Sequence, residues 1–167
     1  HNAVAAAALA LAAGLSLAEV SGGLKNFSNI KGRLNIKQGI KDATLIDDTY
    51  NANPDSMKAA IDVLAAMPAP RIFVMGDMGE LGEDEAAAMH AEVGAYARDQ
   101  GIEAAYFVGD NSVEAAETFG AEGLWFADKD PLIQVLSHDL PERSTVLAIN
   151  GIGALIRIGQ RAFCFLP

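Results

Sequence analysis

The chain has 167 residues, of which 51% are apolar, and carries a formal net charge of −10 with a sequence pI of about 4.6. This length allows one ordinary domain plus a smaller piece, with a sizeable buried core. The acidic balance argues against nucleic-acid binding and against adsorption to an anionic membrane, because both need a basic surface. The alanine-rich run 3–13 is shorter than the ~20 residues that span a bilayer. The single cysteine, Cys164, leaves no internal disulfide, as in cytoplasmic proteins.

The first part of the chain predicts two helices followed by extended structure. The run 3–13 predicts a buried helix that ends at Gly14, and 17–24 predicts a second helix. Gly32 and Arg33 mark the change to extended structure, so we expect a domain boundary near residues 31–42. Strands are expected over 34–40 and 43–46.

Beyond residue 45, strand and helix patterns alternate. Apolar residues at helical spacing from Met57 to Leu64 predict an amphipathic helix over 54–67, and Ile72 to Met75 reads as a strand buried on both faces. We expect Trp125 to fill the core. The order predicts an α/β fold, a Rossmann-like, doubly wound, mostly parallel sheet with helices on both faces. The other expected elements are helices over 83–99, 112–119 and 132–140 and strands over 104–108, 124–127 and 145–149.

The most informative segment is 45–57, which reads L-I-D-D-T-Y-N-A-N-P-D-S-M. An apolar strand ends in Asp47 and Asp48 and leads into a helix that Asn53 can cap, with Pro54 at its first position. Open α/β folds bind polar ligands where a strand end leads into a helix N-terminus. Asn51 is not needed for the cap, which makes it the better ligand candidate.

A second segment, Gly76–Gly82, reads G-D-M-G-E-L-G directly after a predicted strand. It is either a binding loop or an ordinary strand-to-helix loop that needs glycine. His90, in the helix that follows, is either a substrate contact or a packed or solvated histidine. The chain has no G-x-G-x-x-G pattern, which gives a nicotinamide dinucleotide fold little support, and no cluster with zinc-site spacing.

Several blocks resemble the Mur ligase family in the same order. Segment 45–57 is similar to its D-D-[ST]-Y-N-A-N-P-x-S-M signature, and Gly76–Gly82 with His90 resembles its G-D-M-x-E-L-G…H block. The resemblance implies that residues 1–40 are the end of the central ATPase domain and that 41–167 are the Rossmann-like C-terminal ligase domain. Further similar blocks are His1-Asn2 before the alanine-rich helix, Gly22-Gly23-Leu24 with Phe27, Gly32-Arg33, and Phe126–Lys129.

The resemblance implies an ATP-dependent amide ligase of peptidoglycan synthesis, and hence of cell shape and cell division. The implied enzyme adds D-alanyl-D-alanine to UDP-N-acetylmuramoyl-tripeptide through an acyl phosphate, in the cytoplasm, using ATP and Mg²⁺. The chain starts at His1 rather than Met and contains no G-x-x-x-x-G-K-[ST] loop. We therefore expect a C-terminal fragment that is catalytically incomplete by itself, with the metal ligands in another domain and no catalytic residue of its own.

The resemblance also implies which residues bind ligands. Arg33 would reach the ATP phosphates, because a guanidinium is always charged and donates in a fork, and Asp48 would lie near the ribose. The chain departs from the family pattern at Ala5, where a second asparagine is expected, and at 149–153, where K-G-S-R is expected. We interpret 150–167 as an atypical tail, truncated or out of frame. The full set is Asn2, Arg33, Asp48 and Asn51 for ATP, and Asn53, Ser56, Asp77, Glu80 and His90 for substrate.

An alternative from another class is a stand-alone Rossmann-like binding module without catalysis. It would bind a small anionic ligand or a protein partner at the loops after strands 45–48 and 72–75. A P-loop upstream of His1 would favour the ligase, and a native start at residue 1 would favour the module.

Overall fold

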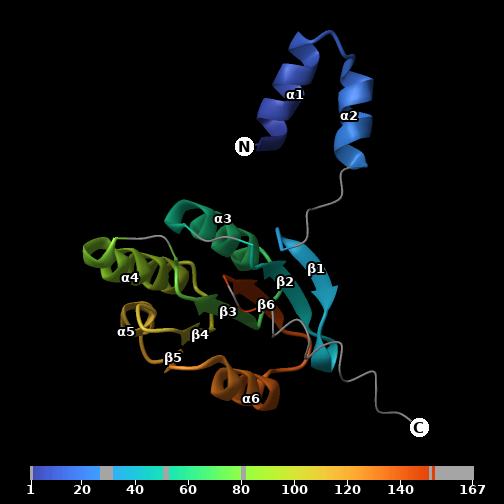
Figure 1. Ribbon diagram of the computed structural model, residues 1–167. Helices are drawn as coiled ribbons and strands as arrows, with labels where there is room; N and C mark the ends of the chain where they lie inside the picture. The colour runs from blue at the N-terminus through green and yellow to red at the C-terminus, as the bar shows by residue number, and fades with distance from the viewer. Residues whose placement is uncertain (1, 27–31, 51–52, 80–81, 151, 153–167) are drawn as a thin grey trace. The chain divides into compact units, whose positions relative to one another are not determined.

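The computed structural model describes residues 2–26, 32–50, 53–79, 82–150 and 152 (Figure 1). The chain divides into two compact units, His1–Ile30 and Lys31–Pro167. The sequence-based boundary after residue 40 would place strand β1 (Asn35–Gln38) in the first piece, whereas here β1 pairs within the sheet of the second unit. Most of the tail, 153–167, lies outside the described residues.

The first unit contains the two predicted helices, α1 (Asn2–Ala12) and α2 (Leu17–Lys25). Ser16 begins α2 with a reciprocal cap, because its hydroxyl accepts from the Glu19 amide and the Glu19 carboxylate accepts from the Ser16 amide. The prediction that residues 3–13 form a buried helix is wrong for this unit, since Val4 and Leu9 are 73% and 72% exposed. Two short helices with many alanines do not enclose a core.

The second unit is built on a six-stranded sheet in the order β1-β2-β6-β3-β4-β5. β1 runs antiparallel to β2, and every other neighbouring pair is parallel. This confirms the predicted Rossmann-like, mostly parallel α/β fold. The elements after β1 are η1 (Ile40–Asp42), β2 (Thr44–Asp48), α3 (Pro54–Ala65), β3 (Arg71–Gly76), α4 (Glu83–Asp99), β4 (Ala104–Val108), α5 (Val113–Phe119), β5 (Gly123–Phe126), α6 (Lys129–Asp139) and β6 (Thr145–Ile149).

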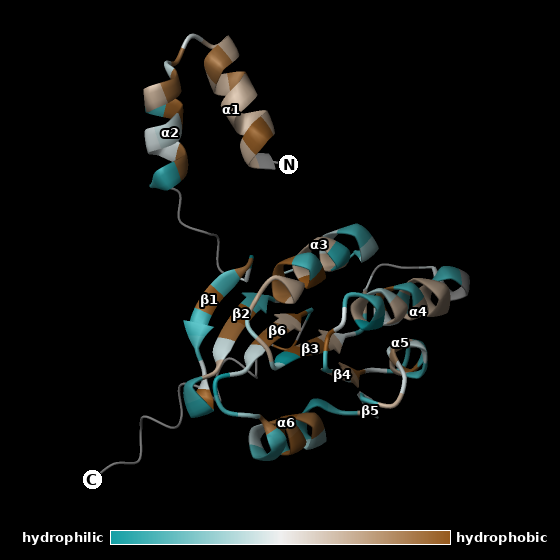
Figure 2. Cartoon of the chain, turned by 180° about the vertical axis from the view of Figure 1, so that it is seen from behind, coloured by the Kyte–Doolittle hydropathy of each residue, from teal (hydrophilic) through white to brown (hydrophobic). Residues whose placement is uncertain are grey.

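Side chains alternate between the two faces of the sheet and build a core on each. Phe73, Phe107 and Leu147 point to the face that packs against α3, α4 and α5. Val74 and Val146 point to the opposite face, which packs against α6. The apolar central strands β6 and β3 lie between these helices (Figure 2), and all five residues of β6 are buried. Burial on both faces explains why the central strands read as continuous apolar runs.

The connections leave the sheet on different sides. The chain passes from β4 to α5 on one face, but from β5 to α6 on the other. The loops that follow these two adjacent parallel strands therefore diverge. Such a topological switch point leaves a crevice at the carboxyl ends of the strands, where open α/β sheets bind ligands.

Candidate functional site

The first polar group at the carboxyl edge of the sheet is a turn over residues 32–35, which we call the Arg33 turn. The Asp48 carboxylate accepts a hydrogen bond from the Leu34 amide at 3.1 Å, and the Tyr50 amide donates to the Gly32 carbonyl at 3.0 Å. The exposed Arg33 guanidinium lies 4.5 Å from the centre of the Tyr50 ring, within cation–π range. The end of β2 thus holds Arg33 at the surface beside Asp48.

The adjacent aspartates of β2 lie in different environments. Burial raises the pKa of Asp47, but hydrogen bonds from Lys37 at 2.7 Å and Thr49 at 2.7 Å outweigh it, so the net pKa is lowered. Burial raises the pKa of Asp48 by more than the Leu34 amide and the Arg33 charge lower it. The repulsion from Asp47 adds to that increase. The surroundings thus favour the ionised form of Asp47 and disfavour the ionised form of Asp48.

Neutralising these two aspartates should have opposite effects on stability. A lowered folded-state pKa stabilises the fold above the ordinary value of 3.8, and this stabilisation is lost as the pH falls through the folded-state pKa. Asp47→Asn should therefore lower the free energy of unfolding by about 1 kcal/mol at neutral pH, with the difference vanishing in acid. Asp48→Asn, whose amide oxygen can still accept from Leu34, should leave stability equal or higher. Urea unfolding at several pH values measures both, and a loss at Asp48 equal to that at Asp47 would contradict the assignment.

The next group caps α3. The Asn53 side-chain oxygen accepts from the backbone N–H of Ser56 at 2.9 Å, and the Ser56 hydroxyl accepts from the backbone N–H of Asn53 at 3.2 Å. This capping box accounts for both side chains without a ligand. Their predicted substrate contacts stay predictions, and Asn51, the better ligand candidate, lies outside the described residues.

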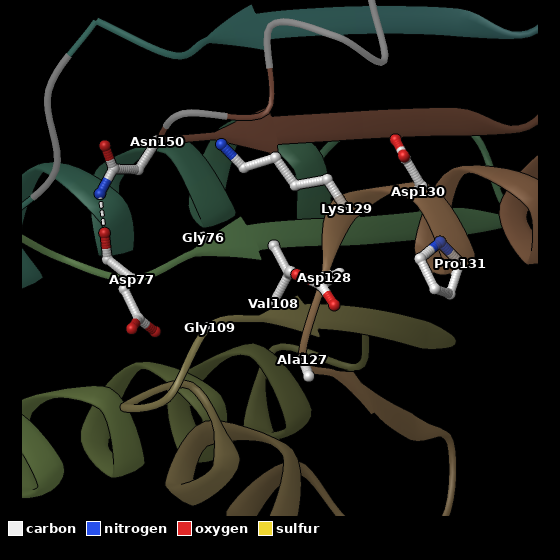
Figure 3. A pocket seen from close by; sticks show the side chains of 10 residues that line it. All are labelled: Gly76, Asp77, Val108, Gly109, Ala127, Asp128, Lys129, Asp130, Pro131 and Asn150. Carbon is white, nitrogen blue, oxygen red and sulfur yellow. Dashed lines mark hydrogen bonds between the residues drawn. The ribbon is translucent and has the colours of Figure 1, made fainter.

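A pocket of about 610 Å³ opens at the switch point between β4 and β5 (Figure 3). It lies at the carboxyl ends of four parallel strands and at the first turn of α6, and it combines carboxylates with one ammonium group and one amide. The Asn150 side chain, directly after β6, donates to the Asp77 carbonyl. The lining residues are Gly76, Asp77, Val108, Gly109, Ala127, Asp128, Lys129, Asp130, Pro131 and Asn150.

Of the predicted substrate residues, Asp77 lines this pocket, whereas His90 is fully buried and is not one of the lining residues. The Met78 amide donates to His90 Nε2 at 3.0 Å, and His90 Nδ1 lies 2.6 Å from the Ala86 carbonyl. This pattern requires a neutral ring that is protonated at Nδ1. His90 therefore has the packed role that the sequence left open, and it fixes the loop after β3. Glu80 of that loop lies outside the described residues, as does the side chain of Asn2.

Apart from Asp77, no pocket residue was predicted to bind a ligand, although the blocks Gly76–Gly82 and Phe126–Lys129 contain several of them. Trp125, expected in the core, is 42% exposed, and its indole N–H donates to the Gly109 carbonyl at 2.8 Å. The position of β5 explains this exposure, because β5 is an edge strand of the sheet and has a neighbouring strand, β4, on one side only. The usable signal was topological: residues that directly follow parallel strands meet at one edge, which would have grouped Gly109, Asp128 and Asn150 with Asp77.

The described parts of the chain offer neither a group of metal-ligating side chains nor a helix that could span a membrane. Within these residues, no three or more His, Cys, Asp or Glu side chains are grouped so that they could hold a metal ion. Among the described helices, none has the length and apolar character needed to cross a membrane.

The fold defines a doubly wound α/β domain with a polar pocket at the carboxyl edge of its sheet. Residues 32–149 match the family model described as "Mur ligase, glutamate ligase domain", and the chain belongs to the Mur ligase family. This confirms the family indicated by the sequence motifs.

Individual relatives agree with this family. The UDP-N-acetylmuramoyl-tripeptide–D-alanyl-D-alanine ligase of Escherichia coli K12 is 43% identical over 145 residues, covering 87% of this chain and 32% of the relative. The ligase of the same name from Haemophilus influenzae is 40% identical over 153 residues, covering 89% and 33%. A crystal structure of MurF from Acinetobacter baumannii has a TM-score of 0.82 at 34% identity, covering 95% and 36%. The chain spans about a third of the length of these proteins, and the similarities favour a ligase domain over a stand-alone binding module.

Proposed function

We propose that this chain is the C-terminal domain of an ATP-dependent ligase that joins D-alanyl-D-alanine to UDP-N-acetylmuramoyl-tripeptide in peptidoglycan synthesis. The observation that carries the proposal is the 43% identity over 145 residues to a ligase of that name. The presence of a surface arginine and a polar pocket at the same edge of the sheet supports it. Because ATP and the nucleotide-linked tripeptide are cytoplasmic metabolites, we place the reaction in the cytoplasm.

The Arg33 turn is the proposed ATP contact of this domain. Arg33 would bind the phosphates, and its stacking on Tyr50 supports this role by holding the planar guanidinium out from the turn. Asp48 would accept from a ribose hydroxyl, and Asn51, three residues further along the chain, is a further nucleotide contact that the motif resemblance implies. Mg²⁺ would neutralise phosphate charge when bound, and we expect its protein ligands in another domain of the ligase.

The switch-point pocket is the proposed site of the incoming dipeptide. D-alanyl-D-alanine is a zwitterion, so its site must receive an ammonium and a carboxylate group. The pocket offers the carboxylates of Asp128 and Asp130 and the ammonium of Lys129, which extends from the start of α6 across the pocket in Figure 3. Glu80 stays a further substrate contact that the motif resemblance implies.

The chemistry requires both sites to work in one sequence. ATP transfers its terminal phosphoryl group to the carboxylate of the tripeptide, giving an acyl phosphate and ADP. The dipeptide amine attacks the acyl carbon, loses a proton, and displaces phosphate to form the amide. An acyl phosphate is hydrolysed by water, so a domain that holds the acceptor and excludes water favours amide formation.

Removing the Arg33 guanidinium tests the proposal. In the complete ligase that carries this chain, Arg33→Ala should lower kcat by about 100-fold, as expected for a charged donor that stabilises transferring phosphate. The melting temperature should stay unchanged, since the side chain is exposed. Arg143→Ala, which removes an exposed arginine just before β6 at the opposite edge of the sheet, is the matched control and should keep full activity. Unchanged turnover of the Arg33 variant would reject the assigned role.

A further inference from the structure

The loop after β4 is tied to Asp77 by two hydrogen bonds. Asp77 Oδ1 accepts from the Ser112 hydroxyl at 2.6 Å, and Oδ2 accepts from the backbone N–H of Asn111 at 3.1 Å. Ser112 is fully buried, directly precedes α5, and is not one of the residues that line the pocket. Both carboxylate oxygens of Asp77 are therefore engaged by the β4–α5 loop.

The backbone of that loop is shaped to receive the carboxylate. Gly109 has φ +115°, and a Cβ atom there would lie 2.4–2.6 Å from the carboxylate atoms of Asp77. A side chain at this position would displace the carboxylate, and an L-residue would also be strained in this conformation. Trp125 holds the same residue from the other side through its bond to the Gly109 carbonyl.

Asp77 also joins the other loops that border the pocket. Its carbonyl accepts from the Asn150 side chain after β6, and the next residue, Met78, is fixed by the buried His90. One residue thus connects the loops after β3, β4 and β6, which together supply one wall of the pocket.

We propose that Asp77 is a positioning residue, whose clamp on Ser112 and Asn111 sets the shape of the pocket, rather than a direct ligand of the dipeptide. This inference rests on the proposed function for its ligand. It deepens that function by assigning a role to Ser112, which no sequence motif singles out.

The test is a titration with D-alanyl-D-alanine of the isotopically labelled 167-residue chain, in which NMR chemical shifts report binding. Four forms of the chain are titrated: wild type, Ser112→Ala, Asp77→Asn and the double variant. Ser112→Ala should weaken binding about tenfold, the equivalent of one charge-assisted hydrogen bond, although Ser112 does not line the pocket. Asp77→Asn should weaken it similarly, and the double variant should be no weaker than the weaker single variant. Ser137→Ala, which removes a hydroxyl bonded within α6 to Ile133, is the control and should bind like the wild type.

The outcomes separate this proposal from the proposed function. If Asp77→Asn weakens binding while Ser112→Ala leaves it unchanged, Asp77 is a direct ligand and the positioning role is overturned. If the wild-type chain does not bind the dipeptide, the substrate assignment fails. The rate of hydrogen exchange at the backbone N–H of Asn111 then tests whether Asp77 and Ser112 hold the loop. About tenfold faster exchange in Ser112→Ala, at a temperature where the fold is intact, supports the clamp, and unchanged exchange overturns it.

Discussion

Replacing Gly94 by alanine should lower the free energy of unfolding by about 4 kcal/mol, although alanine is the better helix former. Gly94 lies in the middle of α4, where α5 crosses it at close range. A Cβ atom at Gly94 would lie 2.2 Å from the Ala115 carbonyl oxygen and 2.6 Å from Thr118 Oγ1. The nearest atom belongs to the backbone of α5, so relief requires the two helices to separate. The Thr118 hydroxyl, which bonds the Ala91 carbonyl across this crossing, would be displaced as well.

Thermal and urea unfolding measure this effect. For a domain of this size, a loss of that magnitude lowers the melting temperature by about 10 °C or more. Gly22→Ala is the matched control, because Gly22 is also inside a helix but has no atom within 4 Å of an added Cβ. It should leave the stability unchanged or slightly higher. A Gly94→Ala variant as stable as the wild type would show that the helices separate at little cost.

Removing the guanidinium of Arg71 should lower the free energy of unfolding by about 3 kcal/mol. Arg71 begins β3, and its guanidinium pairs with both carboxylate oxygens of Glu103, at 2.7 and 3.1 Å. It also donates to the carbonyls of Ala65, at the end of α3, and Gly101, just after α4. One side chain, which is 20% exposed, therefore ties two helix ends to the amino edge of the sheet.

Two further variants test whether the fork geometry matters. Arg71→Met keeps the apolar stem and loses all four bonds, whereas Arg71→Lys keeps the charge without the planar fork and should recover less than half of the loss. Arg98→Met is the control. Arg98 also pairs with a carboxylate, Asp99, but the two side chains are 52% and 65% exposed, so the loss should stay within about 1 kcal/mol. Equal losses at Arg71 and Arg98 would contradict the structural role of Arg71.

The parallel part of the fold could be predicted from the sequence because its signals are strong. The helix over 83–99 and the strands over 104–108 and 145–149 have the predicted bounds. The segment between the first two strands could not be predicted. Lys41 and Asp42 both have positive φ, which a lysine in particular does not indicate. The strand expected over 34–40 stops at Gln38 before a 3₁₀ turn. Such a turn is imposed by the neighbouring packing, since the Lys41 ammonium donates to the carbonyls of His138 and Leu140.

The candidate site was predictable only where it is local in sequence. The Asn53 cap and Pro54 at the first helical position follow from neighbouring residues, so the residue pattern sufficed, whereas the reciprocal bond of Ser56 was not predicted. The Asp77 clamp joins residues 35 positions apart, and its partner Ser112 belongs to no recognisable motif. The burial of His90 could not be predicted either, because a histidine near an apolar stripe can face the core or the solvent.

The position of β6 has a consequence for how the domain is made. β6 is the last of the described strands along the chain, yet it lies between β2 and β3 and pairs with both. Until residues 145–149 have left the ribosome, β2 has no parallel partner and the sheet is split into a hairpin and a three-stranded half. The edges of β2 and β3 that pair with β6 therefore stay unpaired while the rest of the domain is synthesised, at about 5–20 residues per second. Nascent chains of this domain should need protection from aggregation until translation has passed β6.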